Sequence, residues 1–139
     1  MPRINIAFVD HDKAPDRAAL QAAITALKFK LTVEHGYVPF ESAGYLPCTL
    51  DGEDAGFDIR FEPAAELAAK SAAALPVVGT RNSAIVIKWG GDPREVASAF
   101  IVLAALAKDF DAVVIDPEKD VLFAADKLVT RARNSLDEL

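Results

Sequence analysis

The segment over residues 90–108 constrains the fold more than any other part of the chain. It opens with the letters GGDPRE, in which Asp92 suits a helix N-cap, Pro93 suits the first helical position and Glu95 can reach back to the N-cap amide. The residues that follow are apolar on nearly every side: Val96, Phe100, Ile101, Val102, Leu103 and Leu106. A helix of this kind is buried rather than half-exposed. The sequence therefore predicts a helix over 93–108 at the centre of the core.

Patterns elsewhere in the chain predict a mixture of strands and helices. Residues 29–62 read as β-rich, and apolar residues alternate with polar ones over 46–50 and 57–61 on either side of a polar, Gly-containing loop, which indicates a β-hairpin. Further strands are expected at 4–9, 84–89, 112–115 and 121–123, and further helices at 15–28, 63–74 and 124–136. This order favours an α+β fold: a mostly antiparallel sheet with about four helices packed on it.

Length and composition limit the class of protein. A chain of 139 residues fits a single domain spanning 1–139. Its net charge of −6 disfavours non-specific nucleic-acid binding, which needs an excess of Lys and Arg, and it suits a basic partner. The single cysteine, Cys48, excludes an intramolecular disulfide, and it alternates with apolar neighbours as a small buried residue does. One cysteine and two histidines are too few for the usual zinc sites, so we expect no cofactor and no metal.

No stretch of the sequence predicts a targeting or membrane segment. The apolar run at the N-terminus is short and is broken by Asp10, and it lacks the pattern of a signal peptide. The longest apolar stretch, over 96–107, is shorter than the roughly 20 residues that cross a bilayer. We therefore expect a cytoplasmic protein that does not contact a membrane.

The D-x-D sequence at residues 10–12 follows the first predicted strand and resembles the first motif of haloacid-dehalogenase-type phosphatases. The resemblance implies that Asp10 attacks phosphorus and Asp12 acts as acid and base, with Mg²⁺ screening the charges. Asp116 and Asp120, which follow a later strand, match the spacing of a further motif of that family. However, Lys and Ala stand after the D-x-D, where the family has Thr or Val. The alternative, which we favour, is that Asp10 ends a strand and Asp12 caps the first helix.

The loop predicted for the hairpin, residues 51–56, is acidic. The carboxylates of the loop and the strand after it are Asp51, Glu53, Asp54 and Asp58. Their spacing resembles part of an EF-hand loop, but Ala55 stands where a ligand belongs, so calcium binding is not expected. An acidic surface speeds association with a basic partner. We therefore predict that these four carboxylates contact a partner, the alternative being a solvated hairpin tip.

Two segments, 44–64 and 79–107, resemble small acidic bacterial immunity proteins of polymorphic toxin systems. The resemblance implies a non-enzymatic protein that neutralises a cognate toxin by binding it and occluding its active site. A basic toxin, such as a nuclease, would suit the acidic chain. Two alternatives stay open: the Mg²⁺-dependent phosphatase, and an oligomerisation module in which the 93–108 helix packs across a homodimer interface.

Overall fold

Four α-helices and a seven-stranded sheet form the part of the chain that the computed structural model describes, residues 3–139. The strands are β1 (Arg3–Val9), β2 (Leu31–Val33), β3 (Gly44–Leu50), β4 (Glu53–Pro63), β5 (Ser83–Trp89), β6 (Val113–Asp116) and β7 (Val121–Phe123). The helices are α1 (Arg17–Ala26), α2 (Ala64–Ala69), α3 (Pro93–Asp109) and α4 (Ala125–Asp137), with a short 3-10 turn, η1 (His11–Lys13). All neighbouring strands are antiparallel, in the order β2-β3-β4-β5-β1-β6-β7, which confirms the predicted α+β class. None of these helices is long and apolar enough to cross a membrane.

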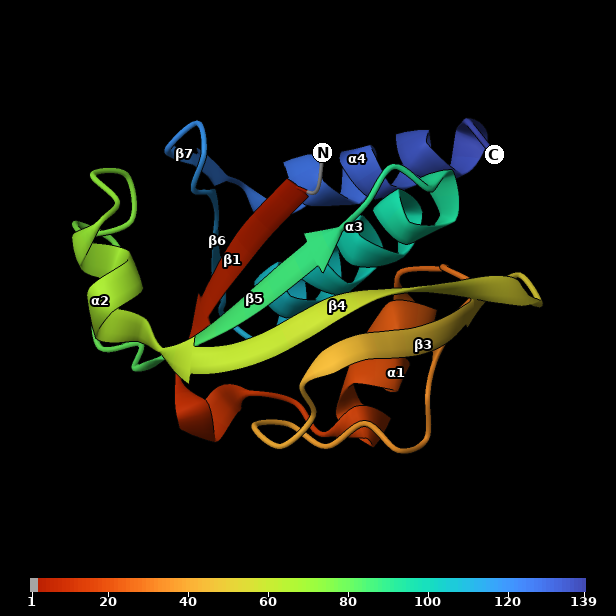
Figure 1. Ribbon diagram of the computed structural model, residues 1–139, viewed down its shortest axis with the longest axis horizontal. Helices are drawn as coiled ribbons and strands as arrows, with labels where there is room; N and C mark the ends of the chain where they lie inside the picture. Colours follow the sequence, from red (N-terminus) through yellow and green to blue (C-terminus); the bar gives the residue numbers. More distant parts are fainter. Residues whose placement is uncertain (1–2) are drawn as a thin grey trace.

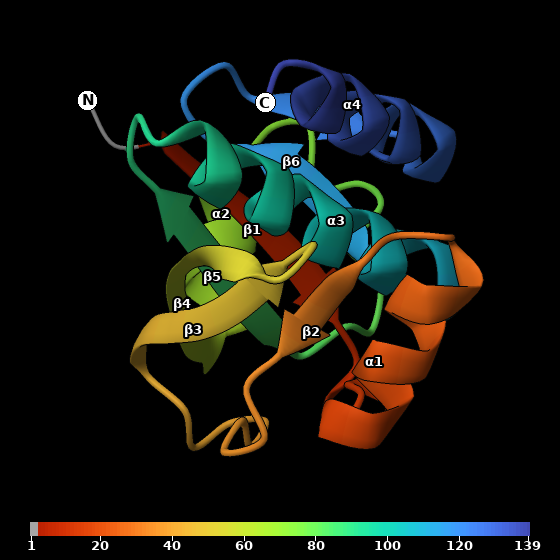
Figure 2. The same ribbon diagram turned by 90° about the vertical axis from the view of Figure 1, so that its right-hand side faces the viewer.

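Helix α3 is the central helix of the core, as its sequence predicts. Every residue from Ala97 to Leu106 is buried, because the sheet lies on one side and α1 and α4 flank the helix (Figure 2). Asp92 caps the helix by accepting a hydrogen bond from the Arg94 amide at 2.8 Å. The prediction for Glu95 is wrong in detail: its carboxylate accepts from the Gly90 amide at 3.1 Å, because the turn after β5 brings that amide over the helix start. Since its own chain buries α3, this helix leaves little surface for the alternative homodimer interface.

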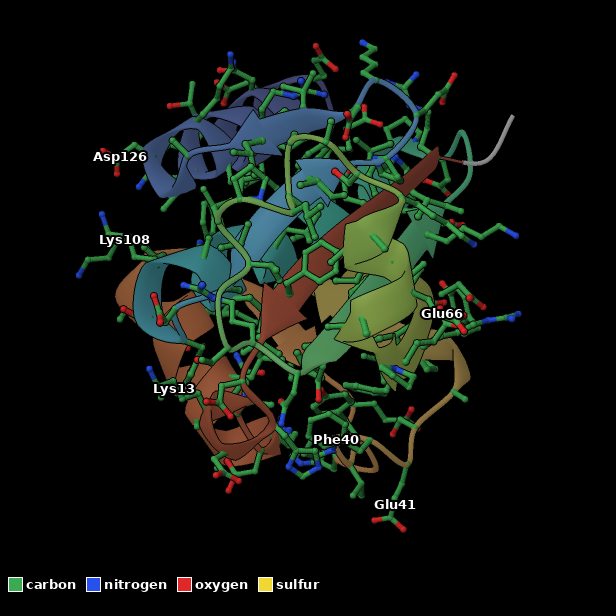
Figure 3. All side chains as sticks on the ribbon, turned by 90° about the vertical axis from the view of Figure 1, so that its left-hand side faces the viewer. Lys13, Phe40, Glu41, Glu66, Lys108 and Asp126 are labelled. Carbon is green, nitrogen blue, oxygen red and sulfur yellow. The ribbon has the colours of Figure 1, made fainter. Side chains whose placement is uncertain are left out.

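The sheet buries apolar side chains on both of its faces. The inner face, which α3 covers, carries Ala7 and Val9 from β1, whereas Ile6 and Phe8 of the same strand point to the outer face and pack with residues of α2. Figures 1 and 3 show α2 at one end of the sheet, while the β3–β4 hairpin lies at the opposite end. The outer face of the hairpin is therefore left without a covering helix in the described chain.

The β3–β4 hairpin has a tighter turn than predicted. The expected loop over 51–56 is wrong: Asp51 and Gly52 alone turn the chain, with φ of 53° and 84°, and β4 begins at Glu53. Two positive φ angles define the turn that an Asp-Gly pair favours between antiparallel strands. The acidic residues after the turn therefore belong to a strand, in which successive side chains point to opposite faces.

Two helix boundaries also differ from the predicted ones. Asp16, rather than Asp12, caps α1, and its side chain accepts a hydrogen bond from the Ala19 amide at 2.8 Å. Asp12 lies instead in η1, before the proline that precedes the helix. Helix α2 ends at Ala69 and not near 74, because Asp120 holds the following backbone in a turn. Both corrections arise from hydrogen bonds between an aspartate side chain and the backbone; the Asp16 bond is local, whereas Asp120 lies 48 residues after Ala72.

Candidate functional site

The four carboxylates predicted to contact a partner do not form one surface. Along β4, Asp54 and Asp58 point to the outer face, whereas Glu53 points to the inner face on which Ala55 is buried. Asp51 lies at the tip of the hairpin, in the turn itself. The short turn causes this division, because strand alternation starts directly after it. Only Asp54 and Asp58 therefore share a face.

Ion pairs within the chain already occupy three of these carboxylates. Glu53 pairs with Arg94 at 2.9 Å, Asp58 with Arg60 at 3.5 Å and Asp51 with Lys30 at 4.0 Å. Such exposed pairs contribute little to stability and exchange readily with other charges. Asp54 makes no ion pair within residues 3–139. Asp54 is thus the hairpin carboxylate most available to a partner.

An exposed tyrosine lies on the same face of the hairpin as Asp54. Tyr45 of β3 is 57% exposed, and its hydroxyl donates a hydrogen bond to the carbonyl oxygen of Ala55 at 3.0 Å. Its ring lies against Gly56, where an added Cβ would come within 2.7 Å of the ring. Partial burial, followed by nearby carboxylates, raises the pKa of Tyr45, so the hydroxyl stays a neutral donor at physiological pH. The hairpin thereby holds an aromatic side chain in a fixed position.

The two residues of the phosphatase-like motif take local structural positions. Asp10 precedes η1, and its carboxylate accepts a hydrogen bond from the Asp12 amide at 3.2 Å. The side chain of Asp12 is 97% exposed and points into solvent, with His11 at 3.9 Å. The prediction that Asp10 ends the first strand agrees with β1 ending at Val9.

The other two aspartates of that hypothesis lie away from Asp10. Strands β1 and β6 are antiparallel, so Asp116, which ends β6, lies at the opposite end of their ladder from Asp10. Asp120 accepts hydrogen bonds from the Ser71 hydroxyl at 2.5 Å and the Ala72 amide at 3.1 Å, and the Ser71 bond lowers the pKa of Asp120. The convergence that the phosphatase hypothesis requires is therefore missing. Within residues 3–139, no three His, Cys, Asp or Glu side chains gather in an arrangement that could hold a metal ion.

Asp116 instead lines a pocket that the sequence patterns did not predict. Residues of β1, β5, β6, β7, α3 and α4 form this pocket, so no short motif contains it. One signal was present in the sequence: Asn5 interrupts an apolar strand on the side that Ala7 and Val9 occupy, which is the inner face of the sheet. A polar residue at such a position is uncommon unless it is bonded.

Comparison with known proteins finds no match for this chain. No protein-family model, no curated protein and no solved structure matches it. The likeness to immunity proteins therefore stays a prediction from the sequence. The proposals that follow are supported by the geometry of this chain and by that prediction.

Proposed function

We propose that this protein acts by binding, and that it covers a basic protein partner with the outer face of its β3–β4 hairpin, as an immunity protein covers a toxin. The observation that carries the proposal is the uncovered face on which exposed Tyr45 lies with Asp54 and Asp58. Tyrosine is among the residues that most often anchor protein interfaces, because it buries a large area with few rotatable bonds. A rigid tyrosine flanked by carboxylates suits a partner with a basic groove.

The β3–β4 hairpin also has an open strand edge along the first half of β4. Strand β4 pairs with β5 from Asp58 onward, so Glu53–Phe57 pair with β3 alone. Figure 1 shows this end of the hairpin extending past β5, away from α2. Strand β2 pairs with β3 over Leu31–Val33, so this end of the sheet has three strands, and its edge at Glu53–Phe57 could occlude an active site while the helices stay outside the contact. This shape supports neutralisation by occlusion.

The charges of the chain support a basic partner. The net charge is −6, and the outer face of the hairpin carries Asp54, which makes no ion pair within residues 3–139, and Asp58, whose partner Arg60 is two-thirds exposed. Opposite charges on two surfaces raise the rate of encounter and suppress partners of the wrong sign. The likeness to immunity proteins supports the narrower proposal that the partner is a toxin.

Co-purification followed by binding kinetics tests the proposal. The tagged protein is captured from the cells that encode it, and the stoichiometric partner is identified by mass spectrometry and purified. We expect an equimolar complex with a basic protein whose activity is lost in the complex. Removing both outer-face charges, in an Asp54→Asn/Asp58→Asn variant, should slow association by about threefold or more at low salt.

A second double variant with the same change in charge is the matched control. Glu66, labelled in Figure 3, is exposed on α2, and Asp109 is exposed at the end of α3, so both lie off the hairpin. The Glu66→Gln/Asp109→Asn variant should keep the association rate of the unaltered chain. Equal slowing in both double variants would assign the effect to net charge and remove the hairpin from the contact. A chain that captures no stoichiometric partner, or whose partner keeps its activity in the complex, would overturn the function.

A further inference from the structure

Four basic side chains gather where β1 begins, in a chain that is acidic as a whole. Arg3, Lys119, Lys127 and Arg131 line a pocket of about 220 Å³ between the start of β1, the β6–β7 turn and α4. None of the four forms an ion pair within residues 3–139, although six of the other Lys and Arg residues do. Asp116 is the acidic residue among the lining groups, so four positive charges face one negative charge. The pocket therefore attracts anions.

A buried amide in the same pocket lacks a hydrogen-bond partner. Asn5 is 3% exposed, and its side-chain nitrogen finds no partner in the described chain. It lies on β1, opposite Ile87 of β5, and it lines the pocket beside the basic groups. Leaving a buried donor unsatisfied is costly, and native structures rarely do so. An acceptor that enters the pocket would satisfy this donor once the Asn5 side chain rotates to present its buried nitrogen to the pocket.

Aromatic side chains line the pocket together with the charged ones. Trp89 and Phe100 line it, and with Arg3 and Arg131 they also line an adjoining cavity of about 300 Å³. The two rings meet edge to face, with centroids 5.2 Å apart, and the Arg131 guanidinium lies 4.7 Å from the centroid of the Phe100 ring. A guanidinium over an aromatic ring keeps its N–H groups free for an anion at the edge. The two cavities together have the size of a small-molecule site.

We propose that this pocket binds a small organic anion, a phosphate monoester or a carboxylate that carries an apolar ring. Its anionic oxygens would lie among Arg3, Lys127 and Arg131, since charge-assisted hydrogen bonds to Arg and Lys are the strong ones. The side-chain nitrogen of Asn5 would donate to one of these oxygens, and the apolar part would pack on Trp89 and Phe100. The lining residues include none of the hairpin carboxylates, so this proposal and the binding of a protein partner succeed or fail separately.

Calorimetry and intrinsic fluorescence test the proposal directly. Trp89 is the single tryptophan of the chain, so a change in its emission locates a ligand in this pocket. The probes are phenyl phosphate, benzoate and the uncharged benzyl alcohol. We expect the two anions to bind saturably with Kd at or below about 1 mM, to change the emission and to weaken as salt is added. Tighter binding of phenyl phosphate would assign the site to phosphate esters, and tighter binding of benzoate would assign it to carboxylates.

A matched pair of arginines on α4 separates this site from general electrostatic attraction. Arg131 lies over Phe100 in the pocket, whereas Arg133 lies over Phe29 outside it, at 5.3 Å from the ring centroid. Arg131→Gln should weaken anion binding by about tenfold or more, and Arg133→Gln should leave it within about twofold. Asn5→Val should also weaken binding while the fold is kept. Equal loss in both arginine variants, equal binding of benzyl alcohol, or no binding of either anion would overturn the proposal.

Discussion

Replacing Asn5 by valine tests whether its side chain is an unsatisfied polar group in the core. The residue lies on β1, which β5 and β6 flank on either side, and it is 3% exposed with no partner for its amide nitrogen in the described chain. Most buried polar groups stabilise a fold through their hydrogen bonds, so their removal is destabilising. Here we expect the free energy of unfolding to increase. The substitution removes the desolvation penalty of the amide nitrogen, and that nitrogen has no hydrogen bond within residues 3–139 to lose.

The expected gain follows from three effects. An unsatisfied buried donor costs about 1–3 kcal/mol. Valine is favoured over asparagine in a strand by up to about 1 kcal/mol. The side chains are similar in size, and the adjoining pocket of about 220 Å³ gives room for the second methyl group, so we expect strain to be small. Asn5→Val should therefore raise the free energy of unfolding by about 1–3 kcal/mol, which for a chain of this length raises Tm by about 3–9 °C.

Guanidinium denaturation followed by circular dichroism, with calorimetry for Tm, measures this change. Asn82→Val is the control, because the side-chain oxygen Oδ1 of Asn82 accepts a hydrogen bond from the His11 amide at 2.8 Å. That variant should lose about 1 kcal/mol. If Asn5→Val instead lost about 1 kcal/mol or more, the Asn5 side chain would have partners within the fold. The argument that its nitrogen awaits a ligand would then fail.

Three further substitutions or treatments test other parts of the structure. Gly56→Ala should cost about 2–4 kcal/mol, because Gly56 has φ of 144° and a Cβ there would lie 2.5 Å from the Leu46 carbonyl oxygen; unfolding within about 1 kcal/mol of the unaltered chain would refute this geometry. Burial, followed by the charge of Glu34, raises the pKa of the Cys48 thiol to about 12, so the folded protein should resist iodoacetamide at pH 8, and alkylation as fast as in the denatured chain would contradict it. Asp120→Asn should destabilise the fold at pH 7. The difference should shrink as pH falls below about 4, because the Ser71 hydroxyl lowers the pKa of Asp120 in the folded state and that stabilisation is lost on protonation; a difference independent of pH would show that the charge is not involved.

The parts of the fold that were predictable from the sequence are those specified by adjacent residues. The N-cap at Asp92 and the apolar residues after it define α3 without information from elsewhere in the chain. Alternation around the Asp51–Gly52 turn likewise defines the hairpin, although the same alternation should have limited the loop to two residues. The buried position of Cys48 follows from the same pattern. Local rules were sufficient in each of these cases.

The parts that were not predictable depend on which strands become neighbours. Placing β1 between β5 and β6 separates Asp10 from Asp116, and no pattern within either strand indicates that separation. The ion pair between Glu53 and Arg94 joins residues 41 positions apart. The sequence therefore did not reveal that an arginine neutralises part of the negative charge of the hairpin. Helix α2 is shorter than its Ala-rich sequence predicts because Asp120, from beyond β6, bonds to the segment after it.

The two proposed sites differ in the kind of physical signal that supports them. Every feature of the hairpin is compatible with stability alone. Its turn, its alternation of buried and exposed residues and its ion pairs would also be present in a stable fold that bound no partner. The pocket at the start of β1 differs, because a fold selected for stability alone would not keep a buried amide at Asn5 that lacks a hydrogen-bond partner within residues 3–139. Natural proteins place such costs at functional sites, where a ligand or a reaction offsets them. The pocket is therefore the part of this molecule whose residues are hardest to explain without a ligand, and a stability gain in Asn5→Val together with lost anion binding would demonstrate that trade-off directly.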